Sequence, residues 1–259
     1  MQRRNFVKSS LLTASALGAG FSLSAAENKA AAKEFYELRV YDLKEVGRQA
    51  ALDEYFQNAL IPALNKFGSK QVGVFRELAK PDSLKVWLLI PYSSFDVYLS
   101  VSKKVKEDES YKKAAAVYNA IPKDNNIYTR YTTSLLIAFD GMPKIIVPKK
   151  DPRVFELRTY ESYSEDAAGR KIKMFNKEEF PIFYRTGLIP VFFGEVIAGD
   201  HMPCLSYLLT FPDLETKEKN WKTFIADEKW KVISKLPEYA DTVSKVISTM
   251  LAPVGYSQV

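Results

Sequence analysis

The sequence predicts an α+β protein in which two tandem ferredoxin-like (β-α-β-β-α-β) units form an intramolecular α+β barrel. Two observations predict this fold: a segment that occurs twice at a nearly constant spacing, and the same order of strand-like and helix-like patterns within each copy. Helices cover one face of such a sheet and leave the other face in need of a partner. Two units in one chain supply that partner to each other, as a pseudo-dimer.

The duplication is visible at the start of each copy. Residues 36–41 read YELRVY and residues 155–160 read FELRTY, 119 positions later, and Pro62 and Gly68 recur as Pro181 and Gly187 at the same spacing. Three more pairs follow in the same order: 87–89 with 207–209, 108–112 with 227–231, and 133–136 with 248–251. This period is far too long for a solenoid, so the sequence contains two homologous domains.

Composition marks the boundary between the copies. Residues 140–152 contain three prolines and a glycine, which is typical of a linker. We therefore divide the chain into a signal peptide at 1–26, a first domain at 27–140, a linker at 141–152 and a second domain at 153–259.

Hydrophobic periodicity gives the elements of each domain. In the first, the helix at 44–67 contains Pro62, which predicts a kink or a break. The other predicted elements of the first domain are strands at 35–41, 71–78, 84–90 and 128–139, and helices at 93–106 and 108–120. Those of the second domain are strands at 154–160, 190–198, 203–211 and 242–252, and helices near 166–186 and 213–236.

The N-terminus has the pattern of an export signal. Arg3, Arg4 and Lys8 precede a weakly apolar run with no acidic residue, and small residues would allow cleavage after Ala26. The arginine pair resembles the twin-arginine signal, and an ordinary Sec signal is the alternative route. The apolar run is too short and too rich in small residues for a comfortable membrane span. We expect an exported, periplasmic protein with no stable membrane insertion after cleavage.

Removing this segment halves the net charge of the chain. The full chain has 37 basic and 31 acidic residues, a net charge of +6, and three of the basic residues lie before the cleavage position. The mature chain would then have 34 basic and 31 acidic residues, a net charge of +3. Neither domain is strongly basic, so we expect no nucleic-acid partner.

Single residues exclude other classes of site. The chain has one cysteine, Cys204, and one histidine, His201, which excludes an internal disulfide and a multi-histidine metal centre. No phosphate-binding or dinucleotide-binding glycine motif and no nucleophile-elbow motif is present. We therefore expect no metal and no cofactor.

Three features together resemble the NIPSNAP family: the repeated Glu-Leu-Arg opening, the proline-containing helix before an aromatic-Gly turn, and YLL at 207–209 followed by Trp221, Phe224, Asp227 and Trp230. The resemblance covers almost all of 34–252 as two copies, and the first copy departs from it, with tyrosines in the tryptophan region. It implies the dimeric α+β barrel fold and no settled reaction.

The repeated opening supplies the candidate site residues. Along an alternating strand, Glu37, Arg39 and Tyr41 share one face, as do Glu156, Arg158 and Tyr160. We expect the apolar set on the other face to lie under the helices and the Glu-Arg-Tyr set to face the barrel lumen. An arginine and a tyrosine suit an anionic ligand. Arg39, Tyr41, Arg158 and Tyr160 are therefore candidate ligand contacts. The alternative is that Glu37 and Glu156 are structural ion-pair partners of these arginines.

Aromatic residues complete the expected pocket between the sheets. Trp87 is a candidate ligand contact, and Phe75, Phe192 and Phe193 are candidate wall residues. His201, in the turn between two strands of the second domain, is a weaker candidate for a general base, since an exposed turn histidine is the simpler interpretation. Trp221, Phe224 and Trp230 have the spacing of core residues that pack on the sheet.

Three functions remain open at this point. The first is a protein that binds a small, partly apolar or anionic molecule between its sheets. The second is a cofactor-independent monooxygenase or isomerase, in which an arginine would stabilise an enolate. The third is a structural or protein-interaction module that uses exposed sheet edges. The sequence also leaves open further assembly into a homo-oligomer.

Overall fold

The computed structural model of the protein describes residues 32–78 and 83–259. The predicted signal peptide at 1–26 lies outside the described residues, so it remains a prediction. The described residues belong to one compact unit. Residues 141–152 have no regular secondary structure, and yet they pack closely, because Met142 and Ile145 are buried and Ile146 N donates to Val191 O.

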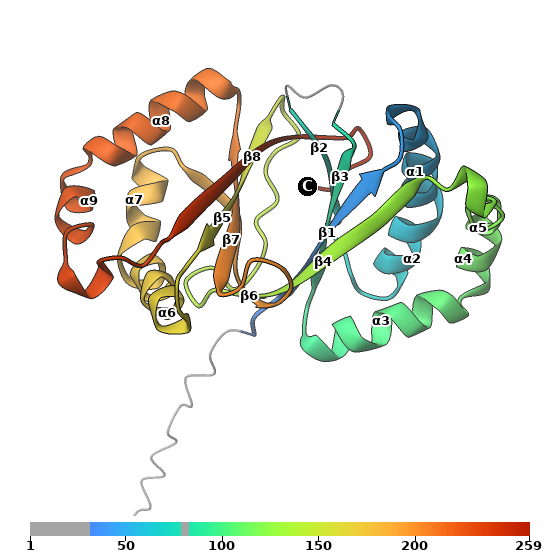
Figure 1. The fold of residues 1–259 in the computed structure, drawn as a ribbon, viewed down its shortest axis with the longest axis horizontal. Coiled ribbons are helices and arrows are strands. Elements are labelled where there is room, and N and C mark those ends of the chain that lie inside the picture. The colour runs from blue at the N-terminus through green and yellow to red at the C-terminus, as the bar shows by residue number, and fades with distance from the viewer. Residues whose placement is uncertain (1–31, 79–82) are drawn as a thin grey trace, which may run out of the picture. The chain divides into compact units, whose positions relative to one another are not determined.

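Eight described strands close into a barrel in which every neighbouring pair is antiparallel (Figure 1). The order around the barrel is β1-β3-β2-β8-β5-β7-β6-β4. Strands β4-β1-β3-β2 form one ferredoxin-like sheet and β8-β5-β7-β6 form the other, and the pairs β4–β6 and β2–β8 join the two sheets. The strands are β1 Phe35–Leu43, β2 Gly73–Glu77, β3 Lys85–Tyr92, β4 Tyr128–Ala138, β5 Val154–Glu161, β6 Ile189–Ala198, β7 Cys204–Phe211 and β8 Lys245–Pro253. The predicted fold class is confirmed.

The helices lie on the outside of the strands, those of the first repeat on one side and those of the second on the other (Figure 1). We call residues 32–140 repeat one and 153–259 repeat two. The α-helices of repeat one are α1 Gln49–Tyr55, α2 Ile61–Lys66, α3 Phe95–Glu107, α4 Glu109–Ala114 and α5 Ala116–Asn119; those of repeat two are α6 Glu165–Met174, α7 Phe180–Arg185, α8 Leu214–Ala226 and α9 Glu228–Ile233. Within the described part of the chain, none of these helices has the length and apolar character that crossing a membrane requires.

The proline of each long helix is accommodated in the same way. A π-helical turn at Phe56–Leu60 joins α1 to α2, and its counterpart at Phe175–Glu179 joins α6 to α7. Pro62 and Pro181 stand one residue into the α-helix that follows. Because the wider π turn changes the hydrogen-bonding partners before the proline, the missing N–H and the ring are tolerated without ending the helix.

The direction of the β1 and β5 side chains differs from our expectation, which was wrong. Tyr41 packs against the helices of repeat one, whereas Tyr36 and Leu38 belong to the core inside the barrel. The same holds in repeat two, where Phe155 and Leu157 face the interior of the barrel and Tyr160 packs on the helix side. The interior of an eight-stranded barrel is just wide enough for side chains to fill, so it takes the apolar set. The Glu-Arg-Tyr sets therefore face the helices.

The sequence match of residues 87–89 with 207–209 was wrong by one residue. In the strand pairing, Arg39 lies opposite Leu88, and Arg158 lies opposite Tyr207. The true counterpart of Tyr207 is thus Leu88, and Trp87 points to the interior of the barrel while Tyr207 points to the helices. A shift of one residue along a strand exchanges the two faces of the sheet.

Candidate functional site

The centre of repeat one's helix-side face is an ion pair on β1. Arg39 Nε lies 2.5 Å from Glu37 Oε1, and Arg39 Nη2 lies 3.1 Å from Glu37 Oε2. Thr133 of β4 donates to Glu37 Oε1 at 3.1 Å and Tyr92 of β3 donates to Oε2 at 2.8 Å. These four bonds match the roughly four lone-pair sites of a carboxylate. Three neighbouring strands thus hold Glu37, and Glu37 fixes the orientation of Arg39.

This environment sets the charge of the pair. Burial alone would raise the pKa of the Glu37 carboxyl, but the hydrogen bonds and charge of Arg39 outweigh it and hold the pKa below its usual value of 4.5. Burial would lower the pKa of Arg39, and the bonds to Glu37 reverse that effect. Both groups are therefore charged at neutral pH, and neither exchanges a proton easily.

A pocket of about 430 Å³ opens in front of Arg39, between the sheet and the helices of repeat one. This volume is within the range of small-molecule sites. Tyrosines from three strands and four helices form much of its wall. They are Tyr41, Tyr55, Tyr92, Tyr98, Tyr111, Tyr118, Tyr128 and Tyr131. We call this cavity the tyrosine pocket.

The phenols of the tyrosine pocket act as hydrogen-bonding groups rather than bases. Burial is the main cause that raises the pKa of Tyr41 to about 12, and it also raises the pKa values of Tyr55, Tyr92 and Tyr118. These hydroxyls stay protonated at neutral pH. Several already bind each other, as where the Tyr55 and Tyr111 oxygens lie 2.9 Å apart. The pocket is thus a preorganised wall of aromatic faces and neutral hydroxyls.

Charge in the tyrosine pocket is positive. Two cationic side chains, Arg39 and Lys106, line it, and its acidic side chain, Glu37, is already bonded to Arg39. Leu99 and Tyr131 are 59% and 45% exposed, so the pocket reaches the surface beside them. This combination suits a partly apolar ligand with an anionic group, since arginine binds carboxylate and enolate oxygens in a fixed planar geometry.

The equivalent ion pair in repeat two, Glu156 with Arg158, is covered by a tryptophan side chain. Arg158 Nη1 lies 2.8 Å from Glu156 Oε1, and Ser248 of β8 donates to the same oxygen at 2.7 Å. Here the indole Nε1 of Trp221 donates to Glu156 Oε2 at 2.6 Å, and the Arg158 guanidinium lies 4.4 Å from the centre of the indole ring. In repeat two the tryptophan side chain therefore covers Arg158, whereas its counterpart in repeat one, Arg39, borders a pocket.

Repeat two also contains a buried ion pair behind its sheet. Lys171 of α6 and Glu179 of the π turn are both buried and contact each other, and the ammonium of Lys171 lies 4.5 Å from the centre of the Phe175 ring. Burial raises the pKa of Glu179, and the charge of Lys171 opposes that effect. Beside them, Tyr207 donates to the Tyr160 hydroxyl at 2.7 Å. Tyr160 is thus engaged by a neighbouring phenol.

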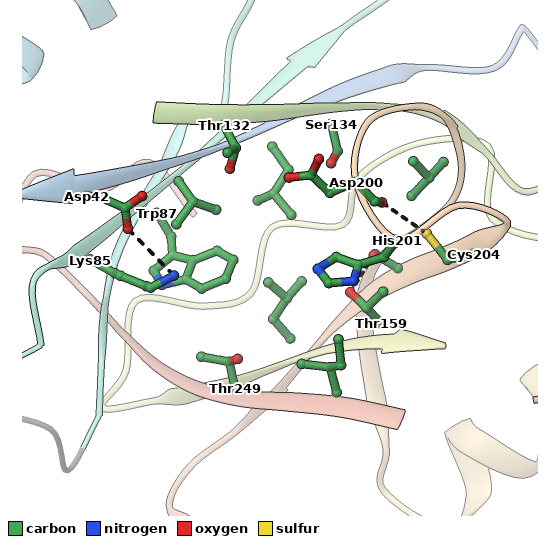
Figure 2. Close-up of a pocket in the computed structure, with 16 residues that line it drawn as sticks. Asp42, Lys85, Trp87, Thr132, Ser134, Thr159, Asp200, His201, Cys204 and Thr249 are labelled. Atoms are coloured by element: carbon green, nitrogen blue, oxygen red, sulfur yellow. Dashed lines mark hydrogen bonds and ion pairs between the residues drawn. The ribbon is translucent and has the colours of Figure 1, made fainter. Parts of the chain in front are cut away.

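A second, smaller pocket of about 230 Å³ lies inside the barrel, at the end where β1 and β5 finish (Figure 2). Trp87 and His201 face each other across it, and hydroxyl groups of Thr132, Ser134 and Thr249 line its walls. The indole nitrogen of Trp87 is buried and has no hydrogen-bond partner among the described residues. We call this cavity the lumen pocket.

His201 stands at the mouth of the lumen pocket, in the turn between β6 and β7. Its Nδ1 lies 2.7 Å from Glu161 Oε1, and Lys245 Nζ lies 3.6 Å from the same oxygen. The side chain of His201 is 53% exposed. Cys204 at the same pocket is buried, and burial raises the pKa of its thiol to about 11, so it is a thiol rather than a thiolate at neutral pH.

The structure therefore separates the candidate residues into three places. Arg39 and Tyr41 line the tyrosine pocket. Arg158 lies under Trp221, and Tyr160 is hydrogen-bonded to Tyr207. Trp87 lies in the lumen pocket with His201. Of the expected wall residues, Phe75 and Phe192 fill the interior of the barrel, whereas Phe193 faces the helices. The helix-side residues Tyr92, Tyr98 and Lys106 were missed, because strand alternation alone did not show which face held the site.

The described part of the chain has neither a cluster of metal-ligating side chains nor a free strand edge. Among residues 32–78 and 83–259, no group of three or more histidine, cysteine, aspartate or glutamate side chains is placed so as to hold a metal ion. The eight described strands each pair on both sides, so the described sheet has no free strand edge.

The fold and the paired Glu-Arg sites define a tandem dimeric α+β barrel. The sequence profile of the NIPSNAP family matches residues 36–133 and again residues 155–258. The chain therefore belongs to the NIPSNAP family and contains two copies of its domain. No curated protein matches the sequence significantly.

Solved structures with the same fold are distant in sequence. A "putative monooxygenase" from Lactobacillus acidophilus NCFM is similar with a TM-score of 0.55 and 12% identity, over 85% of this chain and 94% of that one. A second "putative monooxygenase", from Fusobacterium nucleatum, gives 0.51 and 12%, over 86% and 93%. An "anthrone oxidase-like protein" gives 0.52 and 11%, over 87% and 93%. At this identity the similarity concerns the fold.

Proposed function

We propose that this protein binds a small, partly apolar molecule with an anionic group in the tyrosine pocket of repeat one. The observation that carries the proposal is that Arg39, fixed by Glu37, borders a surface-connected cavity of about 430 Å³ with aromatic walls. A fixed guanidinium in a partly desolvated pocket binds an anion better than a mobile surface cation does.

The experiment uses octanoate and benzoate as anionic probes and octylammonium as a probe of opposite charge. Saturation-transfer NMR on the full chain is expected to detect the two anions and not the cation. Arg39→Met and, separately, Lys106→Met are expected to weaken the anion signals. Lys103→Met removes an exposed charge on the same helix outside the pocket, so it is the matched control. Equal signals in wild type and in both pocket variants would overturn the proposal.

An enzymatic function is the second candidate, and two observations favour it. Structures with this fold include proteins described as putative monooxygenases and as anthrone oxidase-like. In addition, the His201 imidazole at the mouth of the lumen pocket contacts the Glu161 carboxyl, with 2.7 Å between Nδ1 and Oε1. Against it, the carboxyl and the buried phenols of the tyrosine pocket all have pKa values shifted away from neutral pH.

A direct assay separates binding from catalysis. Anthrone and molecular oxygen give anthraquinone and water, and anthraquinone is followed by its absorbance. We expect the wild-type rate to equal that of the protein-free solution. A rate above that background that is lost in His201→Asn or in Arg39→Met would favour the enzyme and would name the pocket that performs the reaction.

We also propose that the protein is exported to the periplasm, on the basis of the N-terminal residues alone. Fractionation of cells that produce the full chain, with Arg3→Lys/Arg4→Lys as the variant, tests both the location and the route. The variant should stay in the cytoplasm if the twin-arginine route is used. Normal export of the variant would favour the Sec route, and a cytoplasmic wild-type protein would overturn export altogether.

A further inference from the structure

The two repeats place different residues at one equivalent position above the arginine. Helices α3 and α8 have the same length, their N-caps are Ser94 and Asp213, and their C-caps are Asp108 and Asp227, in each case 119 residues apart. With this spacing, Ser102 on α3 is the counterpart of Trp221 on α8. Ser102 lines the tyrosine pocket, so the pocket includes the place that the indole takes in repeat two.

The contacts of Trp221 describe what that place accepts. The ring lies against the guanidinium of Arg158, with 4.4 Å from the arginine Cζ to the ring centre. Two other rings border it edge-on, Phe183 at 6.1 Å and Phe224 at 5.5 Å between centres. A flat aromatic group stacked on an arginine is a favourable arrangement, and more so where water is excluded.

In repeat one, a residue of the protein itself, Tyr92, makes the hydrogen bond to the glutamate that the indole makes in repeat two. The Tyr92 hydroxyl donates to Glu37 Oε2, as the Trp221 nitrogen donates to Glu156 Oε2. The counterpart of Tyr92 in repeat two is Phe211, which has no hydroxyl. A ligand in repeat one therefore needs no hydrogen-bond donor for Glu37. What the pocket offers it is the guanidinium of Arg39, whose Cζ lies 5.7 Å from the centre of the Tyr131 ring, and the charge of Lys106.

We propose that the ligand of the tyrosine pocket is a planar aromatic anion that stacks on the Arg39 guanidinium as Trp221 stacks on Arg158. This inference rests on the proposed binding function and specifies the chemical class of the ligand. Trp221 is in this sense an internal equivalent of the ligand, which repeat two carries permanently. The anionic substituent lies toward the Lys106 side of the pocket, and the rings of Tyr41 and Tyr131 border the aromatic part.

The test compares two acids with the same carbon skeleton. One is 2-naphthoate, which is planar and aromatic, and the other is decalin-2-carboxylate, which is saturated and puckered. Isothermal titration calorimetry on the full chain should show 2-naphthoate binding about tenfold more tightly, the size expected of a cation–π stack. Arg39→Lys keeps the charge and removes the planar face, so it should remove most of this preference.

The second variant fills the pocket. Ser102→Trp places an indole where repeat two has one, and it should abolish binding of both acids while the protein stays folded. Lys103→Trp introduces the same side chain one position away, at an exposed residue outside the pocket, and should leave both affinities unchanged. Circular dichroism and a melting curve check that each variant is folded.

The outcomes distinguish the inference from the function on which it rests. Equal affinity for the two acids in wild type, with both lost in Ser102→Trp, would overturn stacking and leave the pocket as an anion site. Octanoate binding without binding of 2-naphthoate would do the same. Binding of 2-naphthoate that Ser102→Trp leaves intact would overturn the inference and also the assignment of the ligand to the tyrosine pocket.

Discussion

Repeat one and repeat two use the same Glu-Arg-Tyr strand and cover it differently. In both, an arginine pairs with the glutamate two residues before it, and a hydroxyl from the last strand of the repeat, Thr133 or Ser248, donates to that glutamate. In repeat two Trp221 lies on the arginine. In repeat one the same position holds Ser102, and a pocket borders Arg39.

The Glu-Arg ion pair that the two repeats share has a structural role that does not depend on a pocket. The ion pair is present with and without a pocket, so its common role is to join two neighbouring strands, β1 to β4 or β5 to β8, through one buried carboxylate. Under our proposal, the arginine has a second role, in ligand binding, only in repeat one, where the residue above it is the small Ser102. One difference between the filled repeat and the open one therefore lies at a single helical position, which holds Trp221 in repeat two and Ser102 in repeat one.

A second difference lies deeper in the helix layer. The buried pair Lys171 and Glu179 of repeat two has Leu52 and Leu60 as its counterparts in repeat one, each 119 residues earlier. Repeat one thus has an apolar layer below its tyrosine pocket, and repeat two has a buried ion pair below a filled site.

The largest expected effect comes from opening repeat two. Trp221→Ser removes a large side chain that packs on Phe183 and Phe224 and leaves Glu156 without its indole donor. We expect the free energy of unfolding to fall by about 4 kcal/mol, measured by urea denaturation. Ser102→Ala, at the equivalent position, should change it by less than about 0.5 kcal/mol. Similar losses in the two variants would show that Ser102 and Trp221 do not differ as we describe.

The next effect concerns the buried pair. Lys171→Leu leaves Glu179 buried without a cation and should cost about 3 kcal/mol of unfolding free energy. The double variant Lys171→Leu/Glu179→Leu reproduces the leucines of repeat one and should recover most of that loss, because two apolar side chains replace two desolvated charges. A double variant as unstable as the single one would mean that the pair contributes more than charge compensation. Chemical denaturation of the two variants and wild type measures the coupling.

A smaller loss is expected when the shared arginine is removed. Arg39→Met and Arg158→Met each leave a buried carboxylate with hydroxyl or indole donors but without its cation, at a cost of about 2 kcal/mol at neutral pH. The two losses should be similar if the ion pair has the same structural role in both repeats. A loss confined to Arg158→Met would instead show that Arg39 is kept for its ligand and contributes nothing to the fold.

The smallest effect is the pH dependence of Glu37. The pKa of this carboxyl is lower in the folded protein than its usual value of 4.5, so the ionised group contributes stability above that value. That contribution is lost as the pH falls through the folded pKa. Glu37→Gln should therefore flatten the acid limb of a plot of melting temperature against pH. An unchanged acid limb would mean that Arg39 does not stabilise the ionised form.

Several features of the fold could be predicted because they are local. The hydrophobic periodicity of each segment predicted the type of the element, and Pro62 predicted a kink or a break in the first long helix, where the structure has a π-helical turn. The core role predicted for Phe224 is confirmed, since it is buried in the helix-side core with Trp221 and Trp230 packed against it. Helical spacing identifies such residues without knowledge of the partner face.

The sequence by itself determined the duplication, the α+β barrel and the residues of the Glu-Arg-Tyr strands. The tertiary structure decided which way those strands face, and thus that Arg39 and Tyr41 line a pocket under the helices of repeat one rather than between the sheets. Both faces of β1 and β5 are covered, one by helices and one by the opposite side of the barrel, so alternation of side chains does not tell them apart. Only closure of the barrel, with its narrow interior, directed Tyr36 and Leu38 inward and Arg39 toward the pocket.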